Sequence, residues 1–286
     1  MEDFDFHQHY QNHEVDISWL SKPSQHEFRW RNSDGRWRKS NRRVSSITTF
    51  RKALFQDNPA DVYFSTSSWL NPIDLPRLSD ETRPHPILLN HLIVFDIDFS
   101  PLSLENLEQA RITTLKLHNW VEQNYDYELI SISFSGSKGF HLFYNDLDRS
   151  LFSIENAKER EIAVKDERKK LLQEVLLAGF KVDPRITADT RRIIRLPGSI
   201  HGKTGLLCHR ISLERLEKGI ESWINDVPSH FADLEIPKTA ISQDKEKKPL
   251  KAYVKEEKEQ IDQYTYMMEV SNHLPGTKAV SYTHLT

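Results

Sequence analysis

Two aspartates, Asp96 and Asp98, stand at the end of an apolar run that begins at Leu88. Because side chains two residues apart in a strand point to the same face, the two carboxylates would lie side by side. Two like charges in that position repel each other and raise one pKa unless a cation neutralises them. Mg²⁺ and Mn²⁺ prefer such oxygen ligands. The pair therefore predicts a divalent-metal site; a polar strand end that caps a turn is the alternative.

A second segment, Ser135–His141, is rich in glycine and serine and contains Lys138. Small residues allow backbone N–H groups to approach a phosphate closely, while Lys138 and His141 add donors and charge. The spacing is not that of the nucleotide-binding P-loop. The segment favours a phosphate-binding loop, although an ordinary strand–turn–strand connection has the same composition.

A third segment, Val182–Gly205, contains Asp183, Asp189, Arg195 and His201. Either aspartate can supply a third metal ligand. Arg195 and His201 flank a Pro-Gly turn, which can direct both side chains towards one ligand. A histidine in a turn is usually structural and an arginine on a strand is usually solvated, so these residues indicate a site only in combination.

Together the three segments contain what metal-assisted nucleotidyl transfer requires: carboxylates that hold metal ions, beside donors that hold a triphosphate. A metal-dependent nuclease would need only the carboxylates. The phosphate-binding character of the second and third segments favours a triphosphate substrate.

The chain has a net charge of −3, but its basic residues are unevenly distributed. Residues 29–52 contain nine Lys/Arg and one acid, Asp34, with Trp30 and Trp37 between them. Basic patches with interleaved aromatic residues are typical of nucleic-acid binding, and a solvated charged face is the alternative. The candidate phosphate contacts in this stretch are Arg38, Arg42 and Arg43.

The composition limits the class of protein. With 286 residues, of which 37% are hydrophobic, the chain can bury a substantial core, and it contains no apolar run long enough to cross a membrane. The one cysteine, Cys208, excludes a disulfide framework and a cysteine-based zinc site within this chain. We therefore expect a cytoplasmic protein without a membrane partner.

The apolar periodicity predicts an α+β fold, in which a mixed sheet carries the carboxylates and helices flank it. The expected helices are residues 46–56, 103–124, 154–179 and 213–225, and the expected strands are residues 61–66, 88–98, 128–134, 140–144, 191–196 and 206–211. Asp183 is expected to open an extended segment. We expect a flexible tail over residues 1–22, a catalytic domain over 23–236 and a charged linker or tail over 237–286.

Taken together, the motifs resemble the archaeo-eukaryotic primase superfamily, most closely the small, catalytic subunit of DNA primase. The first family motif, an apolar strand ending in D-x-D, is matched by residues 95–98, and the second, S-G-x-x-G-x-H, by residues 135–141. The third is matched by Val182-Asp183 and, after a basic strand, by the P-x-S-x-H-x-K-T-G sequence of residues 197–205. With degenerate N-terminal segments at 26–30 and 61–65, the resemblance covers roughly residues 25–235.

The resemblance implies a role for each motif residue. The catalytic metals, Mg²⁺ or Mn²⁺ in a two-metal site, would be bound by Asp96, Asp98 and Asp183. The incoming nucleotide would be contacted by Ser135, Gly136, Lys138, His141, Arg195 and His201. It also implies single-stranded DNA template and primer, NTPs or dNTPs, a primase large subunit as partner, and an archaeal, nucleoid-associated setting.

The chain departs from the family pattern in two respects. The chain lacks the zinc-binding Cys/His insertion and the larger helical insertion of many relatives, so we expect a compact core without zinc.

The rival hypotheses for the function are a plasmid or end-joining primase-polymerase and a non-catalytic nucleic-acid-binding relative. Val280–Leu285 resembles the translated end of a sequencing adaptor, so we expect that this C-terminus is artefactual.

Overall fold

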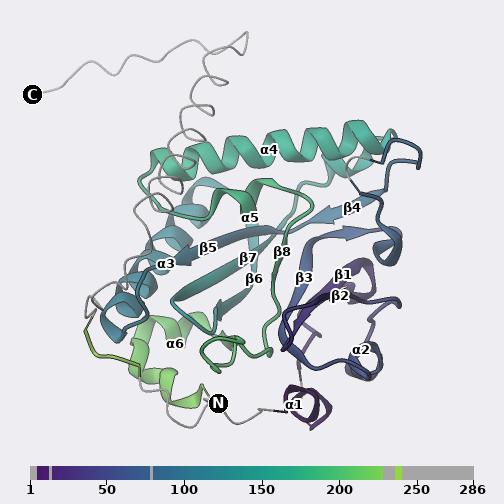
Figure 1. The fold of residues 1–286 in the computed structure, drawn as a ribbon. Coiled ribbons are helices and arrows are strands. Elements are labelled where there is room, and N and C mark those ends of the chain that lie inside the picture. Colours follow the sequence, from purple (N-terminus) through teal and green to yellow (C-terminus); the bar gives the residue numbers. More distant parts are fainter. Residues whose placement is uncertain (1–4, 13–14, 78–79, 228–235, 240–286) are drawn as a thin grey trace, which may run out of the picture. The chain divides into compact units, whose positions relative to one another are not determined.

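The computed structural model describes residues 5–12, 15–77, 80–227 and 236–239, which form two sheets with helices around them (Figure 1). The first sheet has the order β2-β1-β3-β4, and β8 also pairs with β3. Its strands are β1 (His26–Asn32), β2 (Trp37–Lys39), β3 (Pro59–Trp69), β4 (Leu88–His91) and β8 (Ile193–Arg195). The second sheet has the order β5-β7-β6-β9. Its strands are β5 (Ile93–Asp98), β6 (Tyr127–Phe134), β7 (Gly139–Asp146) and β9 (His209–Ile211).

The α+β class is confirmed, but the arrangement of strands differs from the single mixed sheet expected. Every strand pair among the described residues is antiparallel. The expected strand over residues 88–98 is divided at Leu92 into β4, in the first sheet, and β5, in the second. The backbone N–H of Leu92 donates to the carbonyl of Thr66 at 2.9 Å. The run is mostly apolar and mostly buried on both sides of Leu92, so its apolarity does not reveal the break.

Helices cover the second sheet and cap its connections. The α-helices are α1 (Phe6–Asn12), α2 (Ile47–Leu54), α3 (Leu104–Asn124), α4 (Ala157–Leu177), α5 (Pro184–Ala188) and α6 (Leu213–Lys218). The short 3-10 helices are η1 (Pro23–Gln25), η2 (Pro72–Asp74), η3 (Ser150–Ser153), η4 (Ile220–Ser222) and η5 (Ile224–Asp226). No described helix has the length and apolarity needed to span a membrane.

The long helix α3 begins where its sequence predicts. Ser103 caps it by accepting a hydrogen bond from the backbone N–H of Asn106 at 3.1 Å. Its buried face includes Leu107, Ala110 and Leu117, which follow the spacing of one helix face and pack towards β5 and β7. This packing fixes the strand that ends in the two aspartates.

Helix α4 carries a buried carboxylate, Glu161, which anchors the connection between α5 and β8. The carboxylate accepts hydrogen bonds from the Thr190 hydroxyl at 2.6 Å and from Arg191 Nε at 3.2 Å. Burial alone would raise the pKa of Glu161, but these hydrogen bonds outweigh it and lower the pKa to about 2. Glu161 of α4 therefore fixes the segment that leads into β8.

The expected flexible tail over residues 1–22 is wrong for the part that the structure describes. Residues 6–12 form α1, and Phe6, Tyr10 and Val15 are buried. The Tyr10 hydroxyl accepts a hydrogen bond from the backbone N–H of Ile200 at 3.0 Å. The apolar residues that make this contact are scattered among polar ones without a periodic pattern, which is why periodicity does not find them.

Three further differences concern boundaries. Asp183 does not open an extended segment but caps α5, accepting from the backbone N–H of Arg185 at 2.9 Å. The expected helix over 213–225 is shorter, because Gly219, at φ +107°, ends α6 and 3-10 turns follow. At the start of the expected tail, the Pro237 carbonyl accepts a hydrogen bond from the backbone N–H of Leu104, in the first turn of α3. Residues 240–286, including Val280–Leu285, lie outside the described part.

The contact between α1 and Ile200 can be tested with Tyr10→Phe. Removal of the hydroxyl leaves the buried N–H of Ile200 without an acceptor, which we expect to lower the free energy of unfolding by about 1–3 kcal/mol. Thermal melting measures the change. Tyr127→Phe on β6 is the control, because its hydroxyl has no hydrogen bond among the described residues, and equal melting temperatures for the two variants would contradict the contact.

Candidate active site

The three sequence motifs meet at one hollow of about 220 Å³ between the two sheets. β5 supplies the two aspartates, the loop before β7 and β7 itself supply the second motif, and β8 with the following turn supplies the third. The polar residues that line it are Tyr63, Asp96, Asp98, Ser135, Ser137, Lys138, His141, Arg195 and His201. Seven of the predicted site residues are thus brought together.

The carboxylate pair is held in an unfavourable electrostatic state. Burial raises the pKa of Asp96 well above its ordinary value, and the charges of Asp98 and Asp183 raise it further. Burial also raises the pKa of Asp98, against the opposing effect of Lys138, whose Nζ lies 3.5 Å from Asp98 Oδ2. Asp96 Oδ1 is buried and has no hydrogen-bond partner among the described residues. A cation between the two carboxylates would relieve both effects.

Two of the three predicted metal ligands, Asp96 and Asp98, are therefore placed to hold a metal ion. Among the described residues there is no group of three or more His, Cys, Asp or Glu side chains arranged to hold a metal ion. The backbone of Asp183 lies beside the pair, since its N–H donates to the Asp96 carbonyl at 3.0 Å. Its carboxylate, however, caps α5. Asp96 and Asp98 fit a divalent cation, and Asp183 stands next to them without joining the cluster.

The second motif forms a tight loop because of its glycines and its first serine. The Ser135 hydroxyl accepts hydrogen bonds from the backbone N–H groups of Ser137 and Gly139, each at 3.3 Å. A Cβ on Gly139 would lie 1.8 Å from the Ile97 carbonyl oxygen and 2.5 Å from Asp98 Oδ1. The loop can lie directly against the carboxylate strand only because this position has no side chain.

The two histidines of the site are neutral, which for His141 differs from the charge expected from the sequence. Burial and the nearby Arg195 lower the pKa of His141 to about 3 and that of His201 to about 4. His141 lies opposite Asp96 in the strand pairing, with its Nε2 at 3.6 Å from Asp96 Oδ1. The positive charge in the hollow therefore comes from Lys138 and Arg195, while the histidines act as hydrogen-bonding groups.

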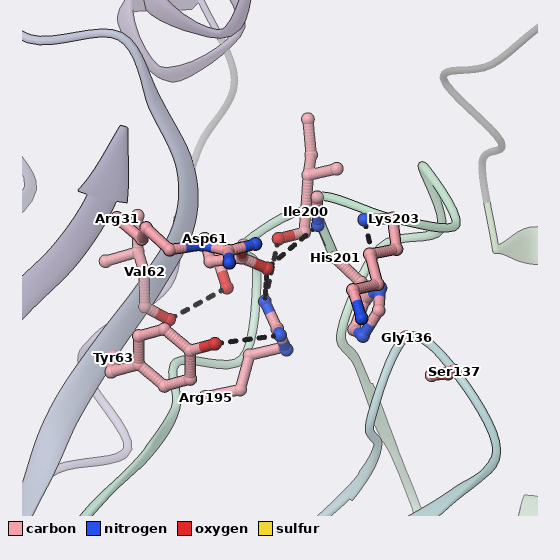
Figure 2. Close-up of polar contacts among 12 residues, drawn as sticks. Arg31, Asp61, Val62, Tyr63, Gly136, Ser137, Arg195, Ile200, His201 and Lys203 are labelled. Carbon is pink, nitrogen blue, oxygen red and sulfur yellow. Dashed lines mark hydrogen bonds and ion pairs between the residues drawn. The ribbon is translucent and has the colours of Figure 1, made fainter. Parts of the chain in front are cut away.

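Arg195 is held by a buried aspartate that the sequence analysis missed (Figure 2). Its Nη1 donates to Asp61 Oδ1 at 2.7 Å and to the Ile200 carbonyl at 3.1 Å, and its Nη2 donates to the Tyr63 hydroxyl at 3.1 Å. Asp61 Oδ1 also accepts from the backbone N–H of Gly202 at 2.8 Å. Asp61 thus positions both the guanidinium and the turn that carries His201. An acid and an aromatic two residues apart at the start of a strand, Asp61 and Tyr63, were the available signal.

The second and third motifs also touch each other directly. The Thr204 hydroxyl donates to the Gly136 carbonyl at 2.5 Å. Gly136 has φ +80°, and a Cβ there would lie 3.0 Å from the Cβ of His201. Gly136 therefore lies at the contact between the second and third motifs, and a side chain at this position would separate them.

The predicted nucleic-acid contacts divide into two groups. Arg38 and Arg42 are exposed, and Arg38 lies 3.8 Å from Asp57. Arg43, in contrast, donates to the backbone carbonyls of Ser24 and Leu70, so it joins two segments of the chain. Of the two interleaved tryptophans, Trp30 is buried and bonded to Asp57, which excludes it from stacking on a base. The ring of Trp37 remains exposed.

Comparison with known proteins matches these motifs. Residues 95–213 match the family model described as DNA primase small subunit. The chain is 28% identical over 216 residues to the DNA primase small subunit PriS of Pyrobaculum aerophilum, covering 62% of this chain and 67% of that protein. It is 26% identical over 223 residues to the PriS of Archaeoglobus fulgidus, covering 56% and 64%. In a short stretch of 40 residues it is 50% identical to the PriS of Methanosarcina barkeri, covering 14% and 10%.

A solved structure, the polymerase domain of Mycobacterium tuberculosis Ligase D in complex with DNA, superposes with a TM-score of 0.48. It is 14% identical in sequence, and the match covers 74% of this chain and 82% of that one. The sequence relatives carry the assignment. The resemblance that the three motifs indicate is thereby confirmed: this chain is a relative of the DNA primase small subunits.

Proposed function

We propose that this chain is the catalytic subunit of a DNA primase, which makes short primers by template-dependent nucleotidyl transfer from NTPs or dNTPs. The observation that carries this function is the meeting of the two aspartates, the Ser/Gly loop and the Arg195–His201 turn around one hollow. A nuclease needs only the carboxylates. The two phosphate-binding segments that face them suit a triphosphate, which nucleotidyl transfer consumes.

The metal ions proposed are Mg²⁺ or Mn²⁺, held by Asp96 and Asp98. Asp183 is the proposed third ligand, which requires its carboxylate to turn from the cap of α5 towards the pair. When bound, such ions lower the pKa of the attacking 3′-hydroxyl and neutralise charge on the phosphates. Desolvation has already raised the pKa of both carboxylates in the hollow, so a cation gains a strong interaction there.

The protein groups proposed for the triphosphate act by position and charge. Lys138 and Arg195 supply positive charge, and the neutral rings of His141 and His201 supply N–H donors. Ser135 and Gly136 shape the loop so that its backbone approaches the phosphates. Because these groups are held by the fold before substrate arrives, they stabilise the developing charge without reorganisation, and no side-chain nucleophile is needed.

The proposed partners are single-stranded DNA template and primer, together with a primase large subunit. Exposed Arg38 and Arg42 are suited to backbone phosphates, which bind by charge and release counterions. The test of the function is incubation with single-stranded template, labelled NTPs or dNTPs, and Mg²⁺ or Mn²⁺. Products that lengthen only with template support it, while a loss of template length without incorporation would indicate a nuclease.

The metal role of the aspartates is tested by Asp96→Asn and Asp98→Asn. We expect each to abolish incorporation while the melting temperature is unchanged or higher, because one of two repelling, desolvated charges is removed. Primer-extension rates and melting curves on the same preparations measure both effects. Asp148→Asn, an exposed acid outside the hollow, is the control. Near-normal incorporation by the folded variants would overturn the assignment.

The raised pKa of Asp96 predicts a pH dependence of stability in metal-free protein. The folded state binds the Asp96 proton more tightly than the unfolded state does, so this stabilisation is present at low pH and is lost as the pH rises through the raised pKa. Asp96→Asn removes this dependence. We therefore expect the melting temperature of the variant to exceed that of the parent increasingly as the pH rises above the ordinary aspartate value of 3.8. A constant difference from pH 4 to pH 8 would contradict the shift.

The buried pair of Asp61 and Arg195 is tested by a double-mutant cycle. Asp61→Ala leaves the buried Arg195 without its carboxylate, and we expect it to lower the free energy of unfolding by about 3–5 kcal/mol. Arg195→Ala leaves the buried Asp61 with Arg31 as its remaining ion-pair partner, so we expect a smaller loss. The double variant should lose much less than the sum. Denaturant unfolding measures the coupling, and additive losses would contradict it.

His201→Ala, which breaks no ion pair, should mainly lower kcat/KM, by roughly 10- to 150-fold for one lost phosphate contact.

A further inference from the structure

A second and larger hollow, of about 530 Å³, lies on the first sheet. Its walls include Glu27 and Arg29 of β1, Arg38 of β2, Ser65 of β3 and the exposed Arg77. Of the three segments singled out in the sequence, only the third contributes to it, through Arg191. The hollow is therefore separate from the candidate active site, and its chemistry requires its own explanation.

The first property of this hollow is a positive charge that the protein does not neutralise. Three of its arginines have ion-pair partners: Arg29 lies 2.8 Å from Glu27, Arg191 lies 3.2 Å from Glu161, and the exposed Arg38 lies 3.8 Å from Asp57. Lys39 and Arg77 also line it, are exposed, and have no ion pair with any described residue. Together with Arg38 they leave a concave surface that favours an anion.

The second property is an exposed aromatic ring at the side of this charge. Trp37 lines the hollow and its side chain is 53% exposed, which is unusual for so large an apolar group. One side of its ring is supported by Tyr63, with the ring centroids 5.4 Å apart and the planes tilted by 37°. A supported aromatic ring beside cations is the arrangement on which a nucleobase stacks.

The third property is a pair of buried polar atoms that lack partners. The Glu27 side chain is only 4% exposed; its Oε2 accepts from Arg29 Nε, but its Oε1 has no hydrogen-bond partner among the described residues. The indole N–H of Trp69, another residue of the wall, is buried and likewise unpartnered in the described part of the chain. Buried polar atoms are normally satisfied, so an orphan acceptor and an orphan donor in one wall point to a ligand with both kinds of group.

We infer that this hollow binds a nucleotide unit, with its phosphate on Arg38, Lys39 and Arg77, its base on Trp37, and a hydroxyl or amino group directed to Glu27. A phosphate, an aromatic ring and a hydrogen-bond donor in one molecule satisfy all three properties. The source of the unit is either a strand of nucleic acid or a free nucleotide. This identification of the ligand agrees with the proposed function, but the three properties do not depend on it.

The position of the hollow relates it to the candidate active site. Tyr63, which supports Trp37, also lines the catalytic hollow, and Ser65, two residues on, lines the second one. Residues two apart on a strand point to the same face, so the two hollows are neighbours along β3. A strand that occupies the second hollow would therefore pass Trp37 and Tyr63 on its way to the carboxylates.

The experiment measures binding without catalysis. A fluorescently labelled single-stranded oligonucleotide is titrated with the full-length protein in EDTA, and unlabelled ATP is titrated separately with the change in tryptophan fluorescence as the signal. We expect Lys39→Glu and Arg77→Glu each to weaken binding of the bound ligand by about tenfold, with a shallower salt dependence. Arg36→Glu is the matched control: it carries the same charge change between β1 and β2, but Arg36 is 72% exposed, is paired with Asp34 and lies outside the hollow.

Two further variants separate nucleotide recognition from general charge. Trp37→Ala should weaken binding by about tenfold through the loss of stacking. Glu27→Gln gives a test of sign: if Glu27 only repels phosphate, the variant binds more tightly, whereas a contact with the ligand makes it bind more weakly. We expect weaker binding, with melting temperatures near that of the parent.

The outcomes are distinct. Loss of oligonucleotide binding alone assigns a strand to the hollow, and loss of ATP binding alone assigns a free nucleotide. Equal binding by the parent, Lys39→Glu and Arg77→Glu, or an equal loss in Arg36→Glu, overturns the site. Binding is measured in EDTA, which prevents nucleotidyl transfer, so binding and polymerisation are tested separately. If the protein binds in this way but does not polymerise when Mg²⁺ or Mn²⁺ is supplied, the proposed function is overturned and the site remains.

Discussion

The ion pair between Asp61 and Arg195 is the interaction on which the candidate active site depends. It joins β3 to β8, two paired strands of the first sheet. The same carboxylate accepts a hydrogen bond from the backbone N–H of Gly202 in the turn that follows β8. Its other oxygen accepts from Arg31 Nη2 of β1 at 3.0 Å. A buried carboxylate needs such a complete set of donors, and by obtaining it Asp61 fixes the position of every third-motif group that faces the hollow.

The two sheets contribute opposite electrostatic characters to the hollow. The second sheet presents Asp96 and Asp98, two carboxylates whose unfavourable burial Lys138 relieves only in part. The first sheet presents Arg195, whose guanidinium is held in place by Asp61. The carboxylates are thus held in an unfavourable state, while the Asp61–Arg195 pair of the other sheet is stable. A protein can keep such an unfavourable group in place when the surrounding structure is stable, and a bound ligand then relieves it.

Much of this could be predicted from the sequence, and the failures have physical reasons. The Asp96/Asp98 strand end, the Ser135 loop and the long helices follow from local patterns, because alternation, glycine and capping residues act over a few positions. The division of residues 88–98 between two sheets could not be predicted, since the run is mostly apolar and mostly buried on both sides of the break. Nor could the role of Asp61, whose partners lie far along the chain.

The same limit applies to the charged and aromatic residues of the basic stretch. Arg43 and Trp30 belong to a stretch whose composition is typical of a nucleic-acid surface, yet both are engaged by the fold. Composition describes what a segment can bind, and only the tertiary structure determines which side chains the fold has already used. Trp37, Lys39 and Arg42, from the same stretch, are among the residues that remain exposed.

The hydrogen bond between Tyr10 and Ile200 joins residues that are 190 positions apart, and the ion pair between Asp61 and Arg195 spans 134. Contacts of such long range form late and slow the folding of a domain. During synthesis on the ribosome, α1 emerges first but cannot complete its contact until the turn at Ile200 has followed. The candidate active site is therefore assembled only after Arg195 and Ile200 have been translated. A truncated product that ends before Arg195 contains both aspartates but lacks the third-motif groups that face them.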